Sequence, residues 1–363
     1  MSKNMDVSKR KQSIIAGGLI SSAGIFFAKF IGLFYAVPYN SMLGTADNLA
    51  YYGVAFNIYS YLLNICTAGF PFAIATLIAK YSTRGDYQTS LLIKKLSASL
   101  MTCFGFGMMI IVILFSSPLA ALVMPDEGDS VKTMQMVLIL ISFALFFVPL
   151  LSSIRGFYQG LKHMEIYALS QVLEQVARVA FLLSASAIAV YALHTDQVWA
   201  LYFGVISTSI SAILAIMHLK LYDKKQMREL KRLAKTQEVA GNNDRREILK
   251  ELVFIAFPYL IVAILGYSDT IVNTLFLSKG LEAHGNTDAE ILLISGSINY
   301  GVLKLMSIPM ILAPGFSSAI IPHITTALTN HDLKLVRKNI RDCVDIVLYI
   351  GLPISFCLFV YAK

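Results

Sequence analysis

Charged residues are scarce in this chain, and their scarcity narrows the class of protein. Of 363 residues, only 14% are Asp, Glu, Lys or Arg, whereas 56% are hydrophobic. A soluble domain of this length needs far less apolar material to fill its core. The composition therefore excludes an ordinary soluble protein and indicates a membrane protein.

The residues that enzymes and metal sites require are few or unsuitably spaced. The chain has no GxxxxGK(S/T) motif, and its histidines show no ligand spacing. The loops predicted to face outward are short, with about 17 residues or fewer, so they lack room for the acid, base and metal ligands of a membrane glycosyltransferase. The four cysteines lie in apolar stretches without CxxC spacing: Cys66, Cys103, Cys343 and Cys357. We therefore expect no enzyme activity, no metal, no cofactor and no disulfide.

Long apolar stretches make up most of the chain. Nine can be distinguished: 14–36, 51–79, 96–123, 131–151, 166–193, 198–219, 252–277, 291–328 and 344–361. Most of them exceed the roughly 20 residues that a helix needs to cross the hydrocarbon core of a bilayer. The sequence therefore predicts an all-α integral membrane protein built as a bundle of many helices.

Lysine and arginine gather in alternate connectors. Segments 1–13, 80–95, 152–165, 220–251 and 329–341 hold 4, 4, 2, 10 and 4 of them, whereas the loops between hold only Lys132 and Lys279. The positive-inside rule places the amino terminus and the basic segments in the cytoplasm. The net charge of +8 is spread over five segments, so it indicates topology and membrane lipids rather than a nucleic-acid partner.

The longest connector divides the chain into two parts. Residues 219–251 include KLYDKKQMRELKRLAKTQEVAGNNDRR, which combines helix formers, clustered charge and an AGNND break. We predict a basic cytoplasmic linker here, between a six-helix transmembrane lobe at 1–218 and the first three helices of a second lobe at 252–363. The first part of the linker could instead form a helix on an anionic lipid surface.

An internal repeat supports this division. A shift of 246 residues aligns GFPFAIATLIAKYSTRGD, residues 69–86, with GFSSAIIPHITTALTNHD, residues 315–332. Identical residues then meet Gly69, Phe70, Ala73, Ile74 and Asp86. Both copies run from outside to inside, which predicts parallel repeats of the kind used by some transporters.

Several ionisable residues fall inside predicted spans, where each costs about 2.5–3.5 kcal/mol near the centre of a helix. They are Lys29, Glu174, Arg178, Asp269 and Lys304. We expect them to line a cavity or to face a partner. Glu174 and Arg178 are four residues apart and could satisfy each other on one helix face. Asp269 could pair with Lys29 or Lys304, or it could bind a coupling proton or sodium ion.

Other polar and helix-breaking residues extend the candidate site. Asn57 and Asn64 share one face of the second span and could line a cavity or form hydrogen bonds between helices. Arg155 and Lys162 lie in a basic turn and could meet an anionic head group at the inner mouth, or simply anchor the topology. A hinge or a static kink is predicted in the eighth span, at Pro309, Pro314 and Gly315.

Two stretches resemble a known family. RGFYQGLKHMEIYALSQVLEQVARV, residues 155–179, resembles the junction of the fourth and fifth helices in polysaccharide biosynthesis proteins of the multidrug/oligosaccharidyl-lipid/polysaccharide flippase superfamily. YGVLKLMSIPMILAPGFSSAIIPHIT, from Tyr300, resembles the eighth helix of the stage V sporulation protein B branch, which is similar to the lipid II flippases. The resemblance extends from about Ser13 to the end. It implies two six-helix lobes and usually two further helices, so the sequence looks truncated after the ninth helix.

The resemblance implies a flippase that moves undecaprenyl-diphosphate-linked cell-wall or polysaccharide precursors across the cytoplasmic membrane by alternating access. The expected partners are the lipid-linked oligosaccharide, membrane lipids and cell-wall synthesis proteins, with coupling to a proton or sodium gradient or to the membrane potential. A cation-coupled multidrug antiporter and a non-transporting scaffold are the alternatives. The excess of cationic residues at Lys29, Arg178 and Lys304 favours an anionic substrate.

Overall fold

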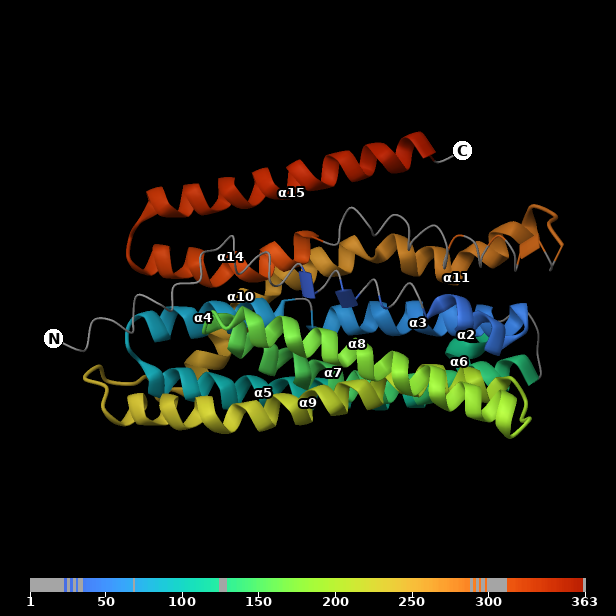
Figure 1. The fold of residues 1–363 in the computed structure, drawn as a ribbon, viewed down its shortest axis with the longest axis horizontal. Coiled ribbons are helices and arrows are strands. Elements are labelled where there is room, and N and C mark those ends of the chain that lie inside the picture. The colour runs from blue at the N-terminus through green and yellow to red at the C-terminus, as the bar shows by residue number, and fades with distance from the viewer. Residues whose placement is uncertain are drawn as a thin grey trace.

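A computed structural model shows the arrangement of the helices (Figure 1). It describes residues 23–24, 27–28, 31, 35–67, 69–123, 129–287, 290–291, 294, 298 and 312–361. Most of the predicted first span and much of the predicted eighth therefore lie outside the described residues. Within the described part, every regular element is a helix.

The helices form two groups along the chain. The first group contains α2 (Ala36–Leu43), α3 (Ala46–Thr67), α4 (Phe70–Thr83), α5 (Tyr87–Leu114), α6 (Ser116–Val123), α7 (Asp129–Gly160), α8 (Met164–Ala187) with the π-helical turn η2 (Ile188–Ala192), and α9 (Val198–Lys235). The second group contains α10 (Arg245–Gly266), α11 (Ser268–Ala283), α14 (Leu312–Thr329) and α15 (Leu333–Tyr361). Figure 1 shows the long helices lying nearly parallel, as they would across a bilayer.

The predicted membrane fold is confirmed. Among the described residues, seven helical segments are long and apolar enough to span a membrane. They are Asp47–Thr83, Tyr87–Leu114, Asp129–Gly160, Met164–Ala192, Val198–Tyr222, Arg245–Leu277 and Leu333–Val360. Each matches one predicted span. The protein is therefore a multi-pass α-helical membrane protein.

Helix α9 changes the expected form of the connector between the two groups. Its 38 residues extend about 57 Å at 1.5 Å per residue, far beyond a hydrocarbon core of about 30 Å. Leu219, Leu230 and Ala234 are buried, so an apolar stripe continues past the membrane and supports the helix there. The first part of the predicted linker is therefore a straight continuation of the sixth span, and only residues 236–244 connect it to α10.

Close helix packing in the first group centres on α7, which contacts α3, α4, α5 and α9. Three glycines of this group, Gly105, Gly156 and Gly160, allow neighbouring helices to approach closely. A Cβ at Gly105 would lie 2.5 Å from the carbonyl oxygen of Leu145, and one at Gly160 would lie 2.6 Å from the Cβ of Ile78. Because membrane helices gain their association largely from close packing, small residues mark such contacts. Gly156 and Gly160, at the basic turn, therefore serve the packing of α7 on α4.

The predicted repeat is confirmed at the turns that follow α4 and α14. The amides of Gly85 and Asp86 donate to carbonyls of α4 at 3.1 and 3.0 Å, and the amides of His331 and Asp332 make the equivalent bonds to α14 at 3.0 and 2.9 Å. Gly85 and His331 both have positive φ, at 78° and 57°, as a Schellman helix ending requires. Each aspartate then accepts the amide three residues further on, at 3.0 and 2.9 Å.

Helices of the two groups pack directly against each other. α4 contacts α10 and α14, while α3 contacts α10 and α11. Figure 1 shows α14 between α4 and α15, with α15 at the edge of the molecule. The repeat-related helices α4 and α14 therefore lie side by side at the junction of the two groups.

A methyl group added at Gly156 tests the packing of α7 on α4. Its Cβ would lie 2.8 Å from the carbonyl oxygen of Pro71, a backbone atom that cannot rotate away. We expect Gly156→Ala to lower the free energy of unfolding by about 1–3 kcal/mol and to lower Tm in detergent. Gly107→Ala is the matched control, because a Cβ at Gly107 meets no atom within 4 Å and gains helix propensity. Equal Tm values for the two variants would contradict this close contact.

Candidate functional site

Arg178 is a buried cation that has no acidic partner among the described residues. It lies on α8, 14 residues after Met164, or about 21 Å along the helix, and only 9% of the residue is exposed. One terminal nitrogen donates to the Tyr52 hydroxyl at 3.1 Å, and the guanidinium carbon lies 5.0 Å from the centre of the Phe56 ring. Its Nε is buried without a hydrogen-bond partner among the described residues. A buried charge in this state attracts an anion.

An aromatic row surrounds this guanidinium. Its rings follow one another at centroid distances of 6.2, 5.3, 5.9 and 5.6 Å, in the order Tyr35, Tyr39, Tyr52, Phe56 and Tyr59. Tyr39 is fixed by donating its hydroxyl to the carbonyl of Ala200 at 3.1 Å. The rings supply electron-rich faces and hydroxyl groups to a cation without neutralising it. Sequence reasoning missed this row, although Tyr52, Phe56 and Tyr59 recur at helical spacing.

Glu174 pairs with Arg155 rather than with Arg178. Nη2 of Arg155 lies 2.8 Å from Oε2 of Glu174, and the two side chains are 11% and 14% exposed. This nitrogen lacks the angle of a hydrogen bond, so the contact is an ion pair held by distance. Nε of Arg155 donates to the Ser170 hydroxyl at 2.8 Å. The predicted self-contained pair of Glu174 and Arg178 is therefore wrong, because α7 brings a competing cation across to α8.

The position of Arg155 also differs from the prediction. It lies inside α7, before the turn, and its side chain is buried between α7 and α8 rather than open at an inner mouth. Lys162 does lie in the turn, with a φ of 64°, and it interacts electrostatically with His323 of α14. Where α3, α7 and α8 meet, the described residues thus place two largely buried arginines beside one carboxylate, a local charge of about +1.

Two predicted polar residues of α3 have different partners. Asn57 donates its Nδ2 to the hydroxyl of Thr274 at 3.2 Å, a contact between α3 and α11 that joins the two helix groups. Asn64 donates to the carbonyl of Ser60 on its own helix at 2.7 Å. Asn57 therefore follows the prediction of a bond between helices, whereas Asn64 satisfies its own backbone.

The remaining predicted residues are only partly described. Asp269 is exposed in the first turn of α11, where an acid suits the helix dipole, and it accepts a bond from the Thr270 hydroxyl at 3.4 Å. Lys29, Lys304 and Pro309 lie outside the described residues, so their predicted pairing with Asp269 and the first part of the hinge stay predictions. Pro314 and Gly315 fall in the first turn of α14, and the predicted hinge there also stays a prediction.

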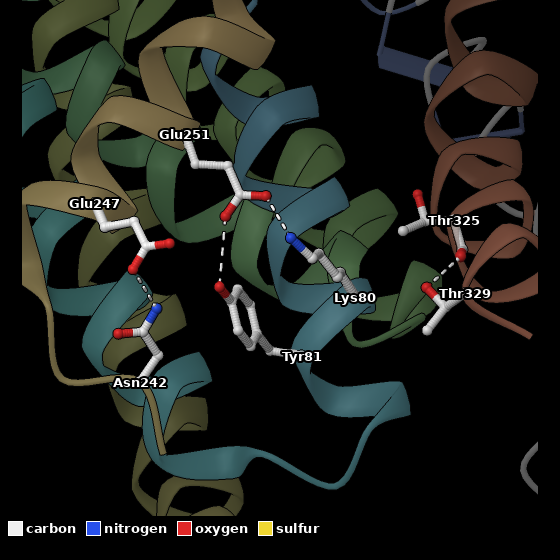
Figure 2. A network of polar contacts seen from close by, with 7 residues as sticks. All are labelled: Lys80, Tyr81, Asn242, Glu247, Glu251, Thr325 and Thr329. Carbon is white, nitrogen blue, oxygen red and sulfur yellow. Dashed lines mark hydrogen bonds and ion pairs between the residues drawn. The ribbon is translucent and has the colours of Figure 1, made fainter. Parts of the chain in front are cut away.

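A polar network joins the two helix groups where α4 ends and α10 begins (Figure 2). Lys80 at the end of α4 forms an ion pair with Glu251 of α10, and the Tyr81 hydroxyl lies 3.4 Å from the other oxygen of Glu251. Beside it, the hydroxyls of Thr83 and Thr326 are 3.3 Å apart, between α4 and α14. We call these three contacts the latch. The sequence offered no sign of it beyond an acidic residue within a basic segment.

The connector between α9 and α10 is fastened to the same end of the molecule. Oε1 of Gln237 accepts the amides of Tyr87 and Gln88, each at 2.9 Å, and Nε2 of Gln237 lies 3.3 Å from Asp86. Asn242 donates its amide to Thr89 at 2.7 Å and its side chain to Glu247 at 3.0 Å (Figure 2). The predicted flexible break is therefore tied to the turn between α4 and α5.

This arrangement is the fold of a membrane transporter. A multidrug resistance MATE family transporter of the MOP superfamily, solved in an outward-facing conformation, matches with a TM-score of 0.71 and 14% identity, over 96% of this chain and 72% of that one. A MOP superfamily transporter from Pyrococcus furiosus matches with a TM-score of 0.69 and 14% identity, over 96% and 72%. At this identity the likeness shows the fold alone. That second structure is described as having a binding pocket of reverse polarity that suggests a different function.

Sequence comparison places the chain within this fold. Residues 14–328 match the model of the polysaccharide biosynthesis protein family, and the chain belongs to that family. It is 31% identical to the lipid II flippase MurJ of Bacillus subtilis (strain 168), over 94% of this chain and 63% of that protein. Stage V sporulation protein B of the same bacterium is 22% identical, over 97% and 66%. The chain thus spans about two thirds of the length of these relatives, and the expected family is confirmed.

Removing the charge of Arg178 tests whether it is a functional rather than a stabilising residue. Because no carboxylate pairs with it among the described residues, Arg178→Met should increase the free energy of unfolding by about 1 kcal/mol. Arg155→Met should lower Tm, since α7 then loses its ion pair with α8 and Ser170 loses a hydrogen bond. Thermal unfolding in detergent measures both. A large loss of stability in Arg178→Met would mean that the cation is needed for folding.

Proposed function

We propose that the protein is a flippase that moves undecaprenyl-diphosphate-linked cell-envelope precursors across the cytoplasmic membrane by alternating access. Membership of the polysaccharide biosynthesis protein family and 31% identity to a lipid II flippase support this class. The observation that carries the proposal is Arg178, a buried cation that no acid neutralises among the described residues. The division into a lobe at 1–218, a connector at 219–251 and a second lobe from 252 is part of the proposal.

The chemistry of the substrate explains why such a cation is useful. A diphosphate cannot enter hydrocarbon without its hydration shell unless charged donors replace the water. Arg178 supplies a planar charge and a buried Nε without a partner, while the Tyr52 hydroxyl adds a neutral polar group. The hydrocarbon tail needs no protein site, because it stays in the lipid. The free-energy cost of transport therefore comes from removing the head group from water, and the charged and polar side chains of the protein offset it.

The same charge argues against the main alternative. A cation-coupled drug antiporter shares this fold, but its substrate would be repelled by a local charge of about +1. In the cluster formed by α3, α7 and α8, the described residues set two arginines, Arg155 and Arg178, against one carboxylate, Glu174. A non-transporting scaffold of the cell-wall machinery stays as the second alternative, and cell-wall synthesis proteins are proposed partners. Lys29 of the first lobe, and Asp269 and Lys304 of the second, stay candidates for the binding site and for ion coupling.

The latch is proposed to open and close during alternating access. Access from the cytoplasm requires α4 to separate from α10 and α14, and so the latch must open. The Lys80 and Glu251 side chains are 29% and 27% exposed, and an ion pair with such access to water is worth about 1 kcal/mol or less. The latch is therefore weak enough to open and close in each cycle. The amino terminus and this latch are proposed to face the cytoplasm, in accord with the positive-inside rule.

Transport is tested with the full-length protein in proteoliposomes that contain fluorescent lipid II. We expect translocation driven by an ion gradient or a membrane potential, and an initial rate reduced about tenfold or more in Arg178→Gln. Lys132→Gln is the control for loss of one positive charge, because Lys132 is an exposed residue paired with Asp129. Wild type that translocates no lipid under any gradient would refute the proposal. Transport of organic cations instead would favour the antiporter.

A reversible cross-link tests the latch. Thr83 and Thr326 have hydroxyls 3.3 Å apart, so cysteines at these positions would bring their sulfur atoms close together. In a background without the native cysteines, Thr83→Cys with Thr326→Cys should cross-link on oxidation and stop transport, and a reductant should restore it. The matched control is Thr83→Cys with Thr102→Cys, because Thr102 lies on α5 within the first helix group. Full transport by the cross-linked protein would show that the latch need not open.

A further inference from the structure

We propose that Arg155 is a positioning residue for anion binding, which it supports by holding Glu174 and thereby leaving Arg178 un-neutralised. This inference rests on the proposed function, because it explains how the binding charge is kept. Arg155 does not have to touch the substrate in this role. Its effect is exerted through the carboxylate that it captures.

The two residues on α8 would otherwise pair with each other. Glu174 and Arg178 are four residues apart, so they lie on the same face of the helix one turn apart. In a membrane such a pair is the simplest way to satisfy two charges. The structure departs from this expectation only because α7 contributes a second arginine.

Arg155 is held in place at two points. Its Nη2 lies 2.8 Å from Glu174, while its Nε donates to the Ser170 hydroxyl at 2.8 Å. Ser170 is fully buried and donates in turn to the carbonyl of Tyr167 at 2.8 Å. Ser170 is held by its own hydrogen bond to Tyr167, and it therefore fixes the orientation of the Arg155 guanidinium. Because the guanidinium of Arg155 is already fixed in this way, it loses little side-chain entropy when it pairs with Glu174. This favours the pair of Glu174 with Arg155.

The consequence is a sorting of charges along α8. Glu174 turns toward α7 and is neutralised there, whereas Arg178 turns toward α3 and its aromatic rings. Tyr59 of α3 interacts electrostatically with both Glu174 and Arg178. Without Arg155, the carboxylate and Arg178 would form a neutral pair, and the site would lose its attraction for an anion.

The test measures binding of undecaprenyl diphosphate to the purified full-length protein in detergent. Undecaprenol, which has the same tail and no charge, is the matched lipid. Arg155→Gln should weaken binding of the diphosphate about tenfold, as Arg178→Gln does, and should leave binding of undecaprenol unchanged. Adding Glu174→Gln to Arg155→Gln should restore most of the lost affinity, because the competing carboxylate is gone. Arg155→Lys should retain most of the affinity, since a cation stays beside Glu174.

Two results would overturn the proposal. One is that Arg155→Gln binds the diphosphate as tightly as wild type. The other is that Glu174→Gln fails to rescue Arg155→Gln, since a residue that merely packs α7 on α8 would give an unrescued loss. Lys132→Gln controls for the general effect of removing one positive charge.

A measurement of stability without added lipid, together with the binding results, distinguishes failure of this proposal from failure of the proposed function. Equal binding of undecaprenyl diphosphate and undecaprenol by wild type would overturn the flippase. The sorting of charges is then decided by double-mutant cycles on Tm for Glu174→Gln and Arg178→Gln. Their coupling should be close to zero in the wild-type background and clear in the Arg155→Gln background, where alone the two residues pair. No coupling in the Arg155→Gln background would overturn the role of Arg155.

Discussion

The ion pair of Arg155 and Glu174 is the contact on which the character of the site depends. It joins α7 to α8 within the first helix group and satisfies two charges that would be costly alone in a membrane. It also leaves Arg178 with only a hydroxyl and an aromatic ring as described partners. The pairing of Glu174 thus decides which arginine, Arg155 or Arg178, keeps an uncompensated charge. The polarity proposed for the substrate follows from that choice.

The two helix groups are related by more than a repeat in sequence. The turns after α4 and α14 share their hydrogen bonds, their positive φ and their capping aspartates, and α4 and α14 then pack against each other. The latch therefore lies where the two copies of one structural unit meet. The connector from α9 forms hydrogen bonds with the first of these turns. A movement of one helix group relative to the other would therefore shift the connector.

Much of this architecture could be predicted from the pattern of residues alone. The long apolar stretches predicted the seven described spans, because hydrocarbon leaves the helix as the way to satisfy each backbone group within one segment. The repeat of residues 69–86 at 315–332 predicted two equivalent turns. The continuation of α9 was missed, because its charged surface conceals the buried stripe at Leu230 and Ala234. The pairing of Glu174 was also predicted wrongly, since helical spacing reveals neighbours on one helix and says nothing of a neighbouring helix.

The sequence by itself determined the class of protein and the position of each described span, and it singled out Glu174 and Arg178 within one of them. These properties depend on composition and on spacing along the chain, which hydrocarbon and helical geometry convert directly into structure. Only the tertiary structure decided which charge meets which. Arg155 is 19 residues from Glu174, and Lys80 is 171 residues from Glu251, so their meeting depends on how helices pack. Packing rests on small residues such as Gly156, whose fit with α4 is a matter of shape in three dimensions.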